Sequence, residues 1–181
     1  MICEETALRG VFVLTPRVFG DSRGWFYESY SKRTLEPFGI TSEFVQDNHS
    51  KSMRIHTLRG LHFQRNPDAQ AKLVRCTAGR IVDVAVDLRK GSPDYLKWVK
   101  VELSAENKRQ IFIPRGFAHG FLTLEEGCEV MYKTDAFYAP QSDAGIRWND
   151  PDIGVDWGVS DPVLSEKDGK SPFLRDFDPG F

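Results

Sequence analysis

The chain has few cysteines, and they form no recognisable framework. Only Cys3, Cys76 and Cys128 occur in 181 residues. An odd number of widely separated cysteines excludes a fully paired disulfide framework, and none of them is spaced as the CxxC of a zinc site. Free thiols of this kind are typical of a reducing compartment, so we expect a cytoplasmic protein.

Long apolar runs and a strong excess of one charge are also missing. The N-terminal stretch MICEETALRG is acidic and predicts no signal peptide, and no segment is apolar for long enough to cross a bilayer. The formal net charge of −2 gives no long-range attraction to nucleic acid. We therefore expect one globular domain, residues 1–181, that binds neither membrane nor nucleic acid and holds any anion by local cations.

Helix signals are scarce, whereas strand signals recur along the chain. SKRTLEPFG predicts one short helix between Ser31 and Gly39. Short apolar segments follow one another about every ten residues with turn residues between them, which is typical of a β-sandwich or barrel. These segments are EFVQDNHS, TLRGLHF, AKLVRCT, RIVDVAVDL, KWVKVELS, RQIFIP, GFLTL and CEVMYKTDAFY. KLVRCTAGRIVDVAVDL predicts a hairpin that turns at Ala78-Gly79.

Strand alternation places two polar side chains on apolar faces. Tyr132 shares a face with Val130, and Lys72 shares a face with Val74, because side chains repeat with a period of two. A lysine on an apolar face needs a partner or a ligand. Tyr132 taken alone also fits a structural position in the core, since a phenol combines a large apolar ring with one polar group.

Other candidates have two interpretations each. Strict alternation puts Arg59 and His62 on opposite faces, but a bulge at Gly60 would bring both to one side. His62 also fits a structural histidine. Asp83 and Asp87 are either charges that protect a sheet edge or partners of residues inside a barrel.

The sequence carries an incomplete metal-binding pattern. IPRGFAHGF has Pro114, Gly116 and His119 in the PxGxxH spacing of the second cupin motif. A metal-binding cupin also has HxH followed by Glu, whereas this chain reads His62-Phe63-Gln64 and then RNPDAQ. Catalytic metal sites normally have three protein ligands, so we expect no metal and favour acid–base chemistry by side chains. No GxGxxG is present to hold a nicotinamide.

Collinear motifs from about residue 10 to about residue 170 resemble the dTDP-4-dehydrorhamnose 3,5-epimerase family. They are FGDSRGWFYES, FVQDNHS, LRGLHFQ, QAKLVR, VDVAVDLRKGSP, VELSAENKRQIFIPRGFAHGF, MYKTDAFYAP, GIRWNDPDIGVDW and LSEKD. The resemblance implies an all-β, cupin-type jelly roll with few short helices, a homodimer, no cofactor and a dTDP-linked 4-keto-6-deoxy sugar as substrate.

The resemblance also implies roles for individual residues. His62 matches the catalytic base, Asp168 its partner, Tyr132 the proton donor and Lys72 the lysine beside the sugar carbonyl. Substrate contacts map to Arg23, Glu28, Gln46, Asp47, Asn48, Arg59, His119, Tyr138, Asp143 and Lys167, with Tyr138 matching the residue that stacks on the base. One position departs from the family: Asp143 stands where glutamate is common, and its side chain is one methylene shorter.

These residue types suit epimerisation beside a ketone. The 4-keto group acidifies the C–H bonds at C3 and C5, so a base on one face, an acid on the other and a cation at the enolate oxygen invert a centre. An imidazole changes charge near neutral pH and is suited to act as the base. The expected function is inversion at both C3 and C5 in dTDP-L-rhamnose biosynthesis. The alternatives are a mono-epimerase, an isomerase of a related nucleotide-linked ketosugar, a non-catalytic sugar-nucleotide-binding cupin and a metal-dependent cupin oxygenase.

Overall fold

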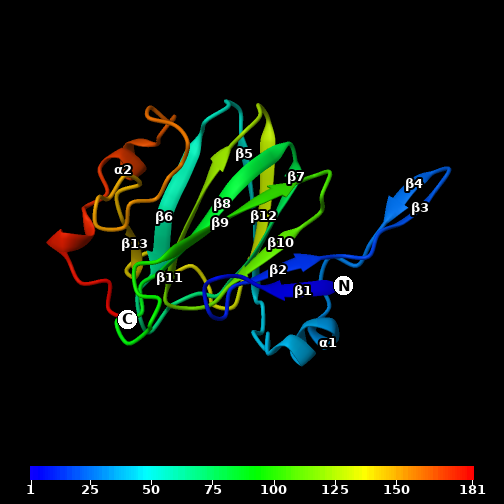
Figure 1. Cartoon of the computed structure of the whole chain (residues 1–181), viewed down its shortest axis with the longest axis horizontal. Coiled ribbons are helices and arrows are strands. Elements are labelled where there is room, and N and C mark those ends of the chain that lie inside the picture. The colour runs from blue at the N-terminus through cyan, green and yellow to red at the C-terminus, as the bar shows by residue number, and fades with distance from the viewer.

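The computed structural model describes residues 1–181 and consists of two antiparallel sheets packed face to face, with a small separate hairpin (Figure 1). The six-stranded sheet has the order β1 (Ile2–Glu5), β2 (Phe12–Thr15), β10 (Gln110–Ile113), β7 (Lys72–Ala78), β12 (Cys128–Thr134) and β5 (Gln46–Ser52). The five-stranded sheet has the order β13 (Asp143–Gly145), β6 (Leu58–Gln64), β11 (Phe117–Thr123), β8 (Arg80–Asp87) and β9 (Trp98–Ser104).

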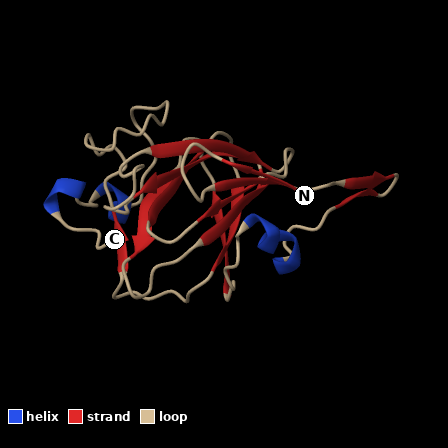
Figure 2. Ribbon diagram, turned by 60° about the horizontal axis from the view of Figure 1, so that its bottom comes forward, coloured by secondary structure: helices blue, strands red, loops and turns tan.

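Helical structure is limited to short pieces (Figure 2). Helix α1 (Lys32–Leu35) begins at its N-cap Ser31 and continues as the 3₁₀ helix η1 (Glu36–Phe38), which ends at Gly39. The C-terminal region contains α2 (Glu166–Gly169) and the 3₁₀ helix η2 (Leu174–Asp176). The all-β prediction and the short helix between Ser31 and Gly39 are therefore confirmed. None of the helices is long and apolar enough to cross a membrane.

Apolar side chains form three clusters, two of which bury the two faces of the five-stranded sheet. Val74, Ile81 and Val130 belong to the cluster between the two sheets. Val84 and Trp157 belong to a second cluster, in which the C-terminal region covers the outer face of the five-stranded sheet. A third cluster packs the segment around α1 against the six-stranded sheet. Burial on both faces explains why RIVDVAVDL is almost continuously apolar.

The predicted hairpin at Ala78-Gly79 is wrong. Strand β7 pairs with β10 and β12, while β8 pairs with β11 and β9, so the chain crosses from one sheet to the other at Gly79. Gly79 has a φ of 71°, and a Cβ there would lie 2.7 Å from the sulfur of Cys128. A tight hairpin and a corner between sheets both favour glycine with positive φ. The local sequence therefore does not separate them.

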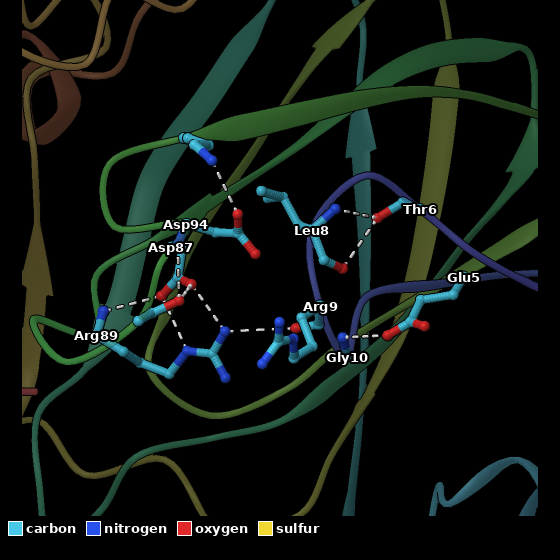
Figure 3. A network of polar contacts seen from close by, with 10 residues as sticks. Glu5, Thr6, Leu8, Arg9, Gly10, Asp87, Arg89 and Asp94 are labelled. Carbon is cyan, nitrogen blue, oxygen red and sulfur yellow. Dashed lines mark hydrogen bonds and ion pairs between the residues drawn. The ribbon is translucent and has the colours of Figure 1, made fainter.

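A buried carboxylate ties the loop after β8 to the N-terminal region (Figure 3). The side chain of Asp87 is fully buried and accepts hydrogen bonds from the Arg89 backbone and guanidinium and from the Ser92 hydroxyl. Arg89 also donates to the Arg9 carbonyl at 3.3 Å. Asp87 is therefore not an edge charge. Burial by itself would raise its pKa, but the bonds from Arg89 and Ser92 lower that pKa below the ordinary value.

We expect Asp87→Asn to lower the free energy of unfolding by about 2 kcal/mol at pH 7, since an amide cannot accept all these bonds. The folded pKa of Asp87 is depressed, so its contribution is present above the unfolded pKa of about 4 and is lost as the pH falls through the folded pKa. The difference from the parent protein should therefore shrink below about pH 4. Urea titrations across pH measure this, with exposed Asp178→Asn as the control. Equal stabilities at pH 7 would contradict it.

Candidate active site

One cavity of about 640 Å³ opens between the two sheets at the end where β5, β6, β7 and β12 converge with the segment before α2. Eleven of the fourteen residues that the sequence singled out line it: Gln46, Asn48, Arg59, His62, Lys72, His119, Tyr132, Tyr138, Asp143, Lys167 and Asp168. Arg65, which directly follows β6, and Arg75 on β7 do not line the cavity. The sequence therefore located a single contiguous site, although its residues lie far apart in the chain.

A bulge at Gly60, one of the two arrangements that the sequence left open, brings Arg59 and His62 to the same cavity. His62 pairs with His119 and Arg59 pairs with Phe121, so three steps along β6 match two along β11. Gly60 has a φ of 121°, and a Cβ there would lie 2.6 Å from the Cα of Gly120. The two backbones approach too closely for any side chain at position 60, so glycine is required for this geometry.

His62 is held by a chain of hydrogen bonds from α2. Its Nε2 lies 2.5 Å from Oδ1 of Asp168, and the Ser165 hydroxyl donates to Oδ2 at 2.9 Å. Burial raises the pKa of Asp168, but the bonds from His62 and Ser165 more than offset this, and the net pKa is lowered. Asp168 is therefore a carboxylate that accepts the Nε2 proton of His62. The second ring nitrogen, Nδ1, is left as the basic atom of the imidazole.

Lys72 and Tyr132 enter the cavity from the sheet opposite His62. Lys72 is 8% exposed, and its ammonium donates to the His62 carbonyl oxygen at 3.4 Å. Burial lowers the pKa of Lys72 to about 8, against the opposing effect of Asp83 and Asp143. Burial raises the pKa of Tyr132, so its phenol keeps its proton at neutral pH. The inward positions predicted for both residues are confirmed.

A second imidazole–carboxylate pair lies beside the first. His119 is buried, and its Nε2 lies 2.8 Å from Oδ2 of Asp83, whose side chain is fully buried on the internal strand β8. Asp83 is thus a partner inside the barrel, one of the two interpretations that the sequence left open. Burial lowers the pKa of His119 despite Asp83, because Lys72 and His62 act in the same direction as burial.

The outer part of the cavity carries charged and aromatic groups. Lys167 binds Asp143 at 2.5 Å, and the Tyr138 hydroxyl donates to the same carboxylate oxygen at 3.2 Å. The shorter side chain at position 143 therefore connects two neighbouring candidate residues. The ring of Tyr138 is 57% exposed, which leaves it open to stack on a planar group. Arg59 is oriented by Ser52 and by the Lys51 carbonyl.

Three sequence candidates lie outside this cavity. Arg23 is on the tip of the hairpin formed by β3 (Phe19–Asp21) and β4 (Gly24–Phe26), where it pairs with Asp21. Glu28 follows that hairpin and accepts a hydrogen bond from Thr34. Asp47 points to the opposite face of β5 from Gln46 and Asn48 and binds Lys133 at 2.8 Å.

Sequence reasoning missed two residues that support the site. Ser165 caps α2 and bonds Asp168, and the S-x-x-D spacing of an N-cap was a usable signal. Gln64 is 4% exposed and bonds the backbone of Asp68, Phe137 and Ala139, which fixes the segment that carries Tyr138. No group of three or more His, Cys, Asp or Glu side chains is placed to hold a metal ion.

Comparisons with known proteins agree on one family. The family model described as dTDP-4-dehydrorhamnose 3,5-epimerase matches residues 5–176. The dTDP-4-dehydrorhamnose 3,5-epimerase of Salmonella typhimurium is 55% identical over 176 residues, which cover 96% of each chain. The Bacillus anthracis enzyme, solved with TDP and PPi bound, is 50% identical with a TM-score of 0.93, covering 96% of this chain and 99% of that one.

The Legionella pneumophila epimerase, solved in complex with dTDP-4-keto-L-rhamnose, is 45% identical with a TM-score of 0.91. The match covers 96% of this chain and 93% of that one. These near-complete matches confirm the predicted cupin-type jelly roll. Since the family model matches residues 5–176 and these relatives are about half identical along almost the whole length, the chain belongs to the dTDP-4-dehydrorhamnose 3,5-epimerase family.

Proposed function

We propose that this protein inverts C3 and C5 of dTDP-4-dehydro-6-deoxy-D-glucose and so forms dTDP-4-dehydro-L-rhamnose, a step of dTDP-L-rhamnose biosynthesis. The observation that carries the proposal is that His62, held by Asp168 of α2, lies on one sheet, while Tyr132 and Lys72 enter the same cavity from the facing sheet. A base and an acid on opposite walls can act on opposite faces of one sugar ring, as inversion requires.

The first step is removal of a proton next to the C4 ketone. Nδ1 of His62 takes the proton from C3 or C5, and the electron pair of the broken C–H bond moves into an enolate. Asp168 accepts the hydrogen bond from Nε2, fixes this tautomer and stabilises the imidazolium that results. General base catalysis of this kind contributes about 10²–10⁴-fold to the rate.

Lys72 stabilises the enolate oxygen that forms at C4. Its ammonium is buried and lies near the His62 backbone, so it can reach an oxygen bound between the two sheets. A positioned donor at a developing oxyanion is worth about 3 kcal/mol. Tyr132 then delivers its phenolic proton to the opposite face of the carbon, and the centre is inverted. No electron leaves the sugar, so the reaction needs no redox cofactor.

Residues at the mouth of the cavity suit the nucleotide. Arg59 and Lys167 supply positive charge for the diphosphate, and the exposed ring of Tyr138 offers a stacking surface for the base. Gln46, Asn48 and His119 offer hydrogen bonds to the sugar and diphosphate. Asp143, which binds both Lys167 and Tyr138, contacts the base edge or orients these two neighbours.

Incubation with dTDP-4-dehydro-6-deoxyglucose in D₂O, followed by NMR, tests the proposed function. The product should carry deuterium at both C3 and C5, and turnover should persist in excess EDTA, because side chains perform both proton transfers. Label at one centre only would support a mono-epimerase instead. Binding of the nucleotide sugar without any exchange would support a non-catalytic binding protein, and loss of activity in EDTA, restored by a divalent metal, would support a metal enzyme.

The projecting β3–β4 hairpin supports a homodimer in which Arg23 and Glu28 serve the partner's cavity. The hairpin extends away from the sheets (Figures 1 and 2), and Phe19, Trp25 and Phe26 on it are 51%, 61% and 70% exposed. Such exposed apolar side chains are typical of an association surface.

We expect a dimer at micromolar concentration by sedimentation, and Phe26→Asp should weaken it together with nucleotide binding. Phe26 is 70% exposed within one chain, so its replacement should leave the fold of the single chain intact. A fully active protein that sediments as a monomer would contradict this arrangement.

A further inference from the structure

Behind His119 in the cavity wall lies a buried carboxylate, Asp83, that the proposed reaction leaves without a role. His62 and His119 lie opposite each other on β6 and β11, and each bonds a carboxylate through Nε2. Asp168 orients the proposed base. Asp83, on the neighbouring strand β8, forms the second pair. The side chain of this acid is fully buried, and its bond to His119 accounts for only one of its two oxygens.

One oxygen of Asp83 has no partner. Oδ2 binds His119 at 2.8 Å, whereas Oδ1 is buried and makes no hydrogen bond. Only one other buried side-chain oxygen, that of Ser50, is left unpaired in the whole chain. Buried carboxylate oxygens are nearly always satisfied, because an unmet acceptor costs about 1–3 kcal/mol. The free oxygen of Asp83 therefore indicates an interaction with a charge or a donor across the cavity.

The buried cation of this cavity is Lys72. Lys72 projects inward from β7 in the opposite sheet, and its ammonium has one long hydrogen bond, to the His62 carbonyl at 3.4 Å. Asp83 and Asp143 are the two carboxylates that favour the charged form of Lys72 against burial. Asp143 already binds Lys167 and Tyr138 through Oδ2, and Asp83 is the one of the two whose free oxygen is buried.

We propose that Asp83 is a positioning residue that acts through two neighbours: Oδ2 fixes the ring of His119, and the negative charge at Oδ1 keeps Lys72 protonated inside the cavity. Only a charged Lys72 is a full cation for the enolate oxygen, so Asp83 sets the upper pH limit of activity. This inference rests on the proposed epimerase reaction. It adds a residue that does not touch the substrate.

The sign of the pH effect follows from the charge. Removing a negative charge near an ammonium destabilises the ammonium, so Lys72 loses its proton at a lower pH. The other titratable and charged groups around the cavity are His62 and Arg59 on β6, His119 on β11, Tyr132 on β12, Tyr138 after β12, Asp143 on β13, and Lys167 and Asp168 on α2. Burial raises the pKa of Tyr132 above its ordinary value, so its titration lies at higher pH than that of Lys72.

The test is the pH profile of kcat/KM for Asp83→Asn, whose amide keeps the shape and can still accept the His119 proton. The basic limb, expected at about pH 8 in the parent protein from the pKa of Lys72, should move down by about one pH unit. Activity relative to the parent should then fall about sixfold more at pH 8.5 than at pH 6.5. In a Lys72→Gln background, Asp83→Asn should not shift the basic limb of the pH profile, because the ammonium on which Asp83 acts is absent. A loss that is equal at every pH would overturn the proposal and give Asp83 a purely structural role.

His119→Gln is the matched control and also decides the matter if Asp83→Asn fails to fold. It removes the imidazole but keeps the Asp83 charge, so the basic limb should stay at the parent pH while KM rises. A limb that moves down in His119→Gln would overturn the proposal, because the carboxylate would then not be what holds Lys72 charged. If the proposed epimerase function itself is wrong, the parent protein will show no turnover at any pH. That result is distinct from a parent that turns over normally while Asp83→Asn leaves the basic limb in place.

Discussion

His62→Ala should lower kcat/KM by about 10³–10⁴-fold and should abolish exchange of the C3 and C5 protons with solvent. Nδ1 of His62 is the basic atom that the Asp168 bond leaves free, and no other imidazole enters the cavity except His119, which is bound to Asp83. Binding of dTDP should change little, because Arg59, Lys167 and Tyr138 remain. NMR in D₂O measures exchange, and calorimetry measures binding.

Two further variants separate chemistry from folding. His62→Asn keeps an amide that can donate to the carboxylate of Asp168, which otherwise retains only the Ser165 hydroxyl and the Gly60 backbone N–H as donors. It should be as inactive as His62→Ala and more stable. His49→Ala removes a histidine outside the cavity that pairs with Glu129, and it should keep full activity. Exchange at the parent rate in His62→Ala would show that another residue is the base.

Tyr132→Phe should uncouple exchange from inversion. His62 and Lys72 remain, so the enolate still forms, and the imidazolium, once it has traded its proton for deuterium, returns deuterium to the face it left. The starting sugar should therefore gain deuterium faster than epimerised product appears. Loss of the acid should slow product formation by about 10²–10⁴-fold.

The fold should tolerate Tyr132→Phe well. The Tyr132 hydroxyl makes no hydrogen bond within the chain, so its removal leaves no buried partner unsatisfied, and the ring keeps its contacts with the central cluster. Tyr95→Phe serves as the control away from the cavity. A folded Tyr132→Phe protein that forms product at the parent rate would remove Tyr132 from the mechanism and leave it a core residue.

Properties that depend on strand alternation could be predicted from the sequence. The inward positions of Lys72 and Tyr132 follow from the period of two, whereas the glycine between Arg59 and His62 allowed a bulge without requiring one. The same period, applied to Gln46, Asp47 and Asn48, would have separated Asp47 from the other two, as the structure does. Strand alternation therefore predicts which of Gln46, Asp47 and Asn48 line the cavity better than the assumption that all three contact the substrate.

Properties that depend on which strands pair could not be predicted from the sequence. Local residues at Gly79 suit a hairpin and a corner equally, and the choice depends on partners elsewhere in the chain. The contact between His62 and Asp168 joins residues 106 positions apart, and only the resemblance to a family suggested it. The sequence did not decide the role of Asp83, because the burial of β8 depends on distant segments. The facing sheet covers its inner face, and the C-terminal region covers its outer face.

The close approach of β6 and β11 has a consequence for laboratory evolution of substrate range. A library randomised at position 60 should return only glycine among active clones, since a Cβ would meet Gly120 at 2.6 Å and the His119 carbonyl at 2.7 Å. Any clone that escaped this would have to part the two strands and lose the alignment of Arg59 with His62. Diversity is better introduced at the cavity mouth, where Tyr138 is open to solvent and Asp143 leaves room for a longer side chain.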